Sequence, residues 1–174
     1  LFRDNHEDKS KSYLVVGVSR SGESSEVILA LKSIESVSNW TKSGVTCHEE
    51  STMYQMAPCL LSPKGREQST VMTKSFSSMT YMVQAAIATA AGKINHYEEL
   101  VKVAQLSADV TKRADAFAKQ LVEAPLYKNY VYLGMGAYFG LAQEACLKLK
   151  EMSNVWTESL GTLEFRHGPK SIIE

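Results

Sequence analysis

The sequence predicts an α/β fold in which helices join the strands of parallel sheets. Residues 13–38 contain an apolar run, a serine-rich turn and a segment with apolar residues at helical spacing. Residues 130–153 repeat this order of strand, turn and helix without repeating the residues. Between these two stretches lie further short apolar runs separated by turns. Strands that alternate with helices are typical of parallel sheets, because each parallel connection needs a crossover.

Three strands are predicted in the first half of the chain. The strand over 13–18 leads through the turn 19–25 into a helix that we expect to reach about residue 38. A strand over 44–47 follows, and after a short helix ended by Pro58 comes a strand at 60–61.

Two long helices are predicted next. The segment 69–91 is rich in alanine and methionine and has few charges, which favours a helix covered on most sides and capped by Gly92. We assign its methionines to the core: Met72, Met79 and Met82. The charged amphipathic pattern over 97–123 predicts a connector or interface helix.

Pro125 marks the predicted domain boundary, with a first domain over 1–123 and a second over 124–174. In the second domain we expect a strand over 130–133, a glycine turn, a helix over 137–153 and a strand over 155–159. A rigid turn then ends in His167, Gly168 and Pro169.

Bulk composition argues against several kinds of partner. Nineteen basic and nineteen acidic residues leave no net charge, so nothing favours nucleic acid or an anionic membrane surface. The least polar segment, 79–91, is too short to span a bilayer, and no signal peptide is recognisable. The cysteines lack CxxC spacing and fit buried thiols in a reducing, cytoplasmic protein: Cys47, Cys59 and Cys146.

The turn after the first strand predicts a phosphate site. A helix that begins here presents unpaired backbone N–H groups and its positive dipole end. Hydroxyls and one guanidinium add hydrogen-bond donors: Ser19, Arg20, Ser21, Ser24 and Ser25. The alternative is that Ser21 or Ser24 only caps the helix. A cap needs a single hydroxyl, whereas this turn supplies several.

A second group of candidates lies on the helix over 137–153. Glu144, Lys148 and Glu151 are spaced i, i+4 and i+7 and share one helix face about 60° wide. Apolar neighbours favour a cleft, although an exposed Glu–Lys helix pair is the simpler alternative. A carboxylate beside a lysine suits proton transfer between two carbons, and His167 before Gly-Pro is a candidate acid or base.

The same segment permits a dinucleotide-binding interpretation. Gly134, Gly136 and Gly140 follow a strand and open a helix, and Glu158 ends the next strand. The spacing is GxGxxxG rather than GxGxxG, and this interpretation gives no role to Lys148 or Glu151.

Four segments together resemble the sugar isomerase (SIS) family: SRSGESSE, GREQSTVMTKSF, LGMGAYFGLAQEACLKLKEMS and EFRHGPKSII. The double-domain members are most similar, including the isomerase part of glucosamine-fructose-6-phosphate aminotransferase and tagatose-6-phosphate ketose/aldose isomerase. The resemblance implies a flavodoxin-like three-layer α/β/α fold for each domain. It also places parts of the family's cleft before residue 1 and after residue 174, so we expect a piece of a longer protein that is inactive alone.

The resemblance also implies roles for particular residues. The phosphate would be bound by Ser19, Arg20, Ser21 and Ser24, where Arg20 replaces the glutamine of the aminotransferase type. Glu151 would carry the proton, with Lys148 and Glu144 in support, and Glu67 and Thr73 would line the same cleft. His167 would assist ring opening across the interface of a homodimer.

Two functions follow as alternatives. The first is isomerisation of a ketose, aldose or amino-sugar 6-phosphate through an enediol or enolamine, with or without deamination or amination, and without metal or organic cofactor. The second is a phosphosugar sensor without turnover. A sensor needs the serine turn but has no use for Glu151, Lys148 and His167 as a proton-transfer group.

Overall fold

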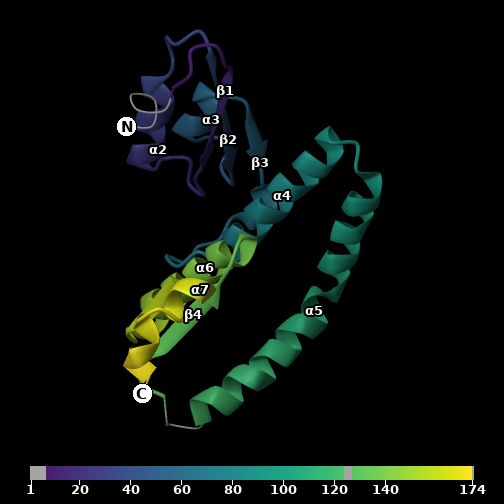
Figure 1. Cartoon of the computed structure of the whole chain (residues 1–174). Coiled ribbons are helices and arrows are strands. Elements are labelled where there is room, and N and C mark those ends of the chain that lie inside the picture. The colour runs from purple at the N-terminus through teal and green to yellow at the C-terminus, as the bar shows by residue number, and fades with distance from the viewer. Residues whose placement is uncertain (1–6, 124–126, 174) are drawn as a thin grey trace. The chain divides into compact units, whose positions relative to one another are not determined.

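The computed structural model describes residues 7–123 and 127–173. It forms two compact units, Leu1–Ala104 and Gln105–Glu174, and the division falls within the helix α5 (Figure 1). The boundary predicted at residues 123 and 124 adjoins the segment 124–126, which lies outside the described residues. The assignment of two SIS domains to 1–123 and 124–174 therefore stays a prediction.

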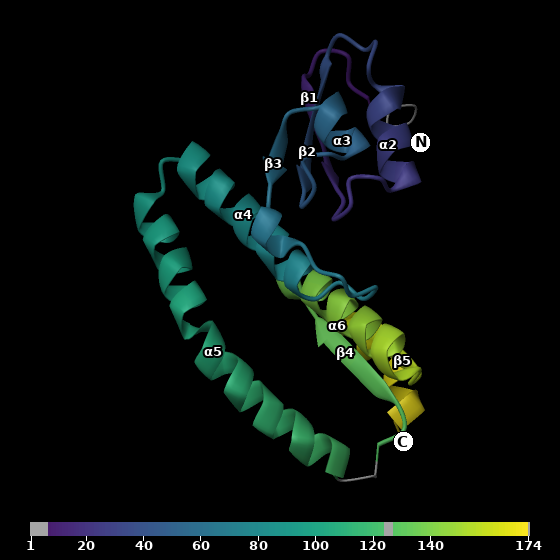
Figure 2. The same cartoon turned by 180° about the vertical axis from the view of Figure 1, so that it is seen from behind.

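A three-stranded parallel sheet forms the centre of the first unit, as predicted. Its strands lie in the order β1 (Tyr13–Val18), β2 (Trp40–Thr46) and β3 (Cys59–Leu61). The helices α2 (Ser25–Ser33) and α3 (Thr52–Met56) pack on one face of this sheet (Figure 2). Leu31 and Met53 are fully buried there, and Ile28, which is 9% exposed, belongs to the same cluster.

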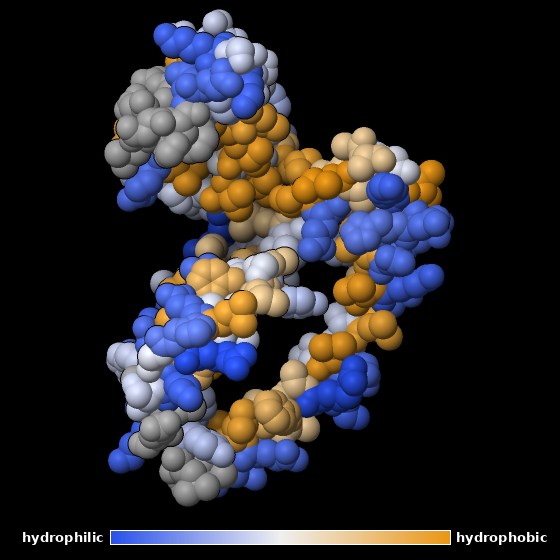
Figure 3. All heavy atoms as spheres, viewed as in Figure 1, coloured by the Kyte–Doolittle hydropathy of each residue, from blue (hydrophilic) through white to orange (hydrophobic). Residues whose placement is uncertain are grey.

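The helix α4 (Lys74–Ala90) packs on the opposite face of the same sheet. Met79 of α4 is buried against Val45 and Cys47, and Val83 adds to this cluster. Strand residues alternate between faces, so the side chains of β1 that share the face of Val45 are Leu14, Val16 and Val18. Their exposed fractions are 62%, 47% and 53%. Figure 3 shows this unit's apolar side chains in orange over the strands.

The connecting helix α5 (Ile94–Glu123) is amphipathic, as expected, with Leu100 as its buried residue. Charged pairs at i, i+4 stabilise it, with Arg113 Nε 3.1 Å from Asp109 Oδ2 and Lys119 Nζ 2.8 Å from Asp115 Oδ2. An interface role for this helix stays a prediction. Among the described helices, none combines the length and the apolar character that crossing a membrane requires.

The second unit contains two parallel strands, β4 (Tyr130–Gly134) and β5 (Thr157–Gly161), covered by α6 (Ala137–Ser153). Ala142 and Cys146 of α6 are buried against this sheet. The short helices α7 (Thr162–Phe165) and η2 (Pro169–Ile173) follow, and the first unit has a similar short turn, η1 (Pro63–Gly65).

Several predicted boundaries were wrong. The first helix ends at Ser33, not near residue 38, because two successive turns lead the chain from Ile34 into β2. That strand already begins at Trp40, whose ring stacks on Tyr13 with centroids 4.6 Å apart. The long helix begins at Lys74 rather than residue 69, so Met72 precedes it and is half-buried. The last strand is Thr157–Gly161 instead of 155–159.

Candidate functional site

The serine turn lies at the carboxyl end of β1, where α/β sheets present their ligand sites. Ser19 is buried, and its hydroxyl accepts a hydrogen bond from the Gly22 N–H at 3.1 Å. The Ser19 and Ser24 hydroxyl oxygens lie 2.8 Å apart. Ser24 occupies the N-cap position of α2, but its side chain makes no capping hydrogen bond. The alternative in which the Ser24 side chain caps this helix was therefore wrong, whereas Ser21 Oγ accepts locally from the Glu23 N–H at 3.2 Å.

Two contacts fix this turn to the start of α3. The Gly22 carbonyl accepts from the Met53 N–H at 3.1 Å. The Glu23 carboxylate accepts from the Thr52 N–H at 2.6 Å and from its hydroxyl at 2.7 Å. These hydrogen bonds lower the pKa of Glu23. Glu23 was not among the residues predicted from the sequence, because its partner Thr52 is distant along the chain.

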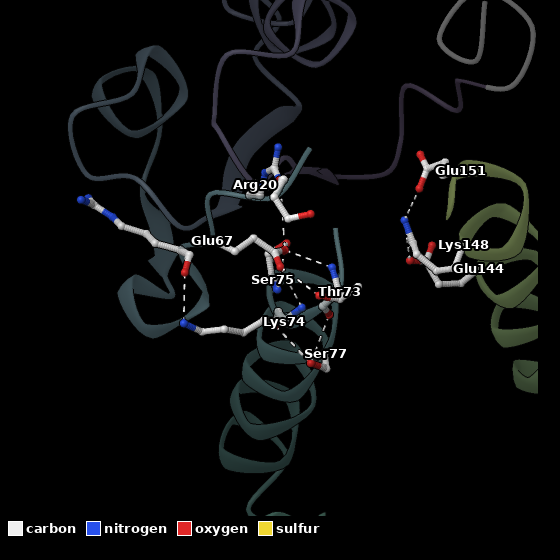
Figure 4. Close-up of polar contacts among 11 residues, drawn as sticks. Arg20, Glu67, Thr73, Lys74, Ser75, Ser77, Glu144, Lys148 and Glu151 are labelled. Atoms are coloured by element: carbon white, nitrogen blue, oxygen red, sulfur yellow. Dashed lines mark hydrogen bonds and ion pairs between the residues drawn. The ribbon is translucent and has the colours of Figure 1, made fainter. Parts of the chain in front are cut away.

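Arg20 joins the serine turn to the segment that follows β3. Its guanidinium donates to the Ser69 carbonyl at 2.8 Å and lies 4.0 Å from Glu67 Oε1 (Figure 4). Its own carbonyl accepts from the Cys47 N–H at 3.0 Å and from the Thr46 hydroxyl at 3.1 Å. Because β2 separates β1 from β3, Arg20 reaches across the carboxyl end of the central strand.

Glu67 caps α4 from outside the helix. Its carboxylate accepts from the backbone N–H groups of Thr73, Lys74 and Ser75 at 3.1, 3.2 and 3.0 Å. The hydroxyls of Thr73 and Ser75 donate to it at 3.0 and 2.5 Å (Figure 4). The Ser75 hydroxyl makes the largest contribution, and these bonds outweigh partial burial and lower the pKa of Glu67 to about 2. The role expected for Glu67 and Thr73 in lining a cleft stays a prediction.

The predicted charged face of α6 is confirmed within the second unit. Lys148 Nζ lies 2.7 Å from Glu151 Oε2 and 3.4 Å from Glu144 Oε1 (Figure 4). The exposed fractions of the Lys148, Glu144 and Glu151 side chains are 18%, 20% and 38%. Lys148 and Glu144 are thus largely covered, unlike a freely solvated helix pair.

The electrostatics of this cluster hold Lys148 in its charged form. Partial burial alone would lower the pKa of Lys148, but the hydrogen bond to Glu151 and the charges of Glu144 and Glu151 together raise it. Within the described residues, Glu144 Oε1 is shielded from solvent and has no partner with hydrogen-bond geometry. The cluster therefore has one fixed cation, a covered carboxylate and the more accessible carboxylate of Glu151.

His167 is exposed on the segment between α7 and η2. Its backbone N–H donates to the Glu164 carbonyl at 2.9 Å, and Gly168 follows with φ +130°. Lys148 pairs with Glu144 and Glu151, and among the described residues no salt bridge or hydrogen bond joins the His167 side chain to this cluster. The acid–base role of His167 stays a prediction.

The glycine turn after β4 does not fit a dinucleotide fingerprint well. A Cβ atom on Gly134 would lie 2.3 Å from the Tyr138 carbonyl oxygen. The first glycine therefore allows the end of β4 and the backbone of α6 to approach each other closely. At Gly140 a Cβ atom would meet nothing within 4 Å, whereas the third fingerprint glycine is needed for close packing of helix and strand. A cavity lies beside the turn at the ends of β4 and β5, lined by residues that include Gly136, Thr162 and Glu164.

The cysteines are free thiols, with Cys47 and Cys146 buried and Cys59 half-buried, as expected for packing residues. Burial raises the pKa of the Cys47 and Cys59 thiols. Over residues 7–123 and 127–173, no group of three or more His, Cys, Asp or Glu side chains is placed to hold a metal ion.

Similar proteins and solved structures identify the family, although no family model matches the chain. A glutamine–fructose-6-phosphate aminotransferase (isomerizing) of Brucella abortus is 32% identical over 99% of this chain. The crystal structure of glucosamine-6-phosphate deaminase from Thermotoga maritima superposes over 98% of this chain with a TM-score of 0.79 and 30% identity. The chain belongs to the sugar isomerase (SIS) family.

The SIS fold extends to more distant structures. Tagatose-6-phosphate ketose/aldose isomerase from Escherichia coli has a TM-score of 0.82 over 97% of this chain at 24% identity, which shows a shared fold. The chain spans 30% of the length of the Brucella protein and 52% of the Thermotoga structure. The parallel α/β architecture predicted from the sequence is thus that of SIS proteins.

Proposed function

We propose that the protein isomerises a ketose, aldose or amino-sugar 6-phosphate by moving a proton between C1 and C2. The Glu144–Lys148–Glu151 cluster carries this proposal, because phosphosugar binding alone requires no covered lysine between two carboxylates. The related proteins support it, since one is named an isomerizing aminotransferase and another a glucosamine-6-phosphate deaminase.

The phosphate would bind at the serine turn. Neutral hydroxyls, the Arg20 guanidinium and the N–H groups of the first turn of α2 suit a dianion. Ser19 and Ser24 contribute oxygens 2.8 Å apart, and Ser21 is exposed beside them. Anchoring by Glu23 and Thr52 means that this turn is formed before the ligand arrives.

Glu151 would act as the base in proton transfer. Its carboxylate takes the proton from C2 of the aldose, or from C1 of the ketose, and the electron pair of that C–H bond forms the enediol double bond as the carbonyl oxygen gains a proton. The proton on Glu151 then returns to the other carbon, while the second oxygen loses its proton and becomes the carbonyl. Lys148 Nζ lies 2.7 Å from Glu151 Oε2, and this ion pair limits the movement of the carboxylate. In this proposal His167 protonates the ring oxygen as its bond to the anomeric carbon breaks, and the anomeric hydroxyl gives its proton to water and becomes the carbonyl. A homodimer brings the partner's copy of this histidine to the site.

Solvent exchange tests the proposal. The full-length native protein is incubated with fructose 6-phosphate in deuterated water, and deuterium at C1 or C2 is measured by NMR. We expect incorporation by the unsubstituted protein and a loss of about 100-fold or more for Glu151→Gln, in line with the contribution of a general base. Binding of several hexose and hexosamine 6-phosphates without exchange would favour the sensor function instead. Ammonia release from glucosamine 6-phosphate would identify the deaminating variant of the reaction.

A further inference from the structure

Glu67 is held more firmly than capping α4 requires. A single side-chain hydroxyl usually satisfies one N–H of a helix start, yet here a carboxylate accepts from Thr73, Lys74 and Ser75 with both oxygens. Thr73 occupies the N-cap position itself, but its side chain makes no capping bond and donates to Glu67 instead. Five donors fill the lone-pair positions of the carboxylate and prevent it from rotating.

The fixed charge of Glu67 lies beside Arg20. The side chain of Glu67 is 9% exposed and that of Arg20 is 23% exposed, and the closest atoms are 4.0 Å apart. An ion pair that is largely shielded from water is screened less than a surface pair. The Ser69 carbonyl accepts from the same guanidinium nitrogen, Nη1, at 2.8 Å. Arg20 is therefore held at one nitrogen by the segment after β3, and the guanidinium has further N–H donors for a ligand.

We propose that Glu67 is a positioning residue that holds Arg20 for the phosphate group of the ligand. It acts through Arg20, whose backbone forms part of the serine turn while its guanidinium extends toward Glu67. A neutral hydroxyl cap is sufficient to begin a helix, but it would leave the Arg20 side chain free to adopt other rotamers. This inference rests on the proposed phosphosugar site, and it adds a residue that makes no contact with the ligand.

A double-mutant cycle tests the proposal. The dissociation constant for fructose 6-phosphate is measured by calorimetry for the full-length protein and for Arg20→Ala, Glu67→Gln and the double variant. We expect each single change to raise the dissociation constant by about tenfold. If the two residues act as a pair, the coupling between them is also about tenfold, which lies within the range for contacting residues. The double variant should bind no more weakly than Arg20→Ala alone. Additive losses would overturn the positioning role, because Glu67 would then act independently of Arg20.

A matched variant separates positioning from helix stability. Ser75→Ala removes the 2.5 Å hydroxyl contact to Glu67 but keeps the charge and the backbone donors. We expect it to lower the denaturation midpoint and to leave the dissociation constant unchanged. A loss of binding as large as that of Glu67→Gln would overturn the proposal.

A measurement without ligand distinguishes this inference from the proposed function. The Arg20 Nε–H signal in NMR should show slow side-chain motion in the unsubstituted protein and fast averaging in Glu67→Gln. Unchanged side-chain order in Glu67→Gln overturns the positioning role whether or not sugar binds. Ordered Arg20 with no phosphosugar or inorganic phosphate binding by the unsubstituted protein overturns both its ligand role and the phosphate site.

Discussion

At the scale of single residues, Gly22 has the strictest requirement in the serine turn. Its φ is +68°, and a Cβ atom would lie 2.2 Å from Ser51 Oγ. A side chain there would meet both a disfavoured backbone conformation and a collision with the cap of α3. Ser51 itself is buried, so it has little room to move.

We predict that Gly22→Ala destabilises the protein by about 2–4 kcal/mol, from left-handed strain plus overpacking. The measurement is the free energy of unfolding in urea. Gly92 is the matched control, because it has φ +64° but nothing within 4 Å of a Cβ atom. Gly92→Ala should therefore cost only about 1–2 kcal/mol. Equal losses at the two positions would show that the contact with Ser51 is relieved by a small shift.

The site residues whose proximity could be predicted from the sequence are those that are close together along one helix. Glu144, Lys148 and Glu151 are one or two helical turns apart, so helical periodicity alone placed them together. The hydrogen bonds of Glu23 to Thr52 and of Arg20 to Ser69 join segments distant in sequence. The local sequence pattern does not predict such contacts, because these segments become neighbours only when the sheet forms.

At the scale of elements, the start of α4 shows how a carboxylate outside a helix sets its first residue. The composition of 69–91 is compatible with a helix throughout, yet the helix begins at Lys74. The N–H groups of Thr73, Lys74 and Ser75 all donate to Glu67, so the backbone turns into the helix at that point. Periodicity predicts that an element exists, whereas its end depends on such a cap.

This cap makes stability depend on pH. The pKa of Glu67 is about 2 in the folded protein against an ordinary value of 4.5. A carboxyl with a lowered folded pKa contributes stability that is fully present above its unfolded pKa and is lost as the pH falls toward the folded pKa. We predict a loss of stability between pH 4.5 and about 2 that is smaller in Glu67→Gln. Urea midpoints measured across this range provide the check.

The control for the acid effect is an exposed carboxylate. Glu35 forms an ion pair with Lys42 at 2.8 Å, but its side chain is 62% exposed. Exposed pairs contribute little to stability, so Glu35→Gln should retain nearly the full acid-induced loss. If Glu67→Gln and Glu35→Gln gave the same pH profile as the unsubstituted protein, Glu67 would not be a source of the acid sensitivity.

At the scale of the whole molecule, the repeated order of strand, turn and helix was sufficient to predict the fold class. Parallel pairing in both sheets follows from that order, and the comparisons confirm the SIS family. The division into compact units was not predictable, because it falls inside α5, where the helical pattern continues without interruption. The exposed apolar residues of β1 were not predictable either, since alternation identifies the two faces of a strand but not which elements cover each face.

The arrangement of the chain in two units predicts separable defects. In the proposed function the first unit holds the phosphate and the second transfers the proton. Ser24→Ala should therefore weaken fructose 6-phosphate binding by about three- to tenfold, the usual effect of losing one hydrogen bond. Once the substrate is saturating, exchange should continue at a similar rate. Glu151→Gln should leave the dissociation constant unchanged and abolish deuterium exchange.

The control is Glu123→Gln, which changes an exposed carboxylate at the end of α5 and should alter neither quantity. Calorimetry and the exchange assay on the same samples would decide the matter, because a variant set in which binding and exchange always fall together would contradict this division of roles.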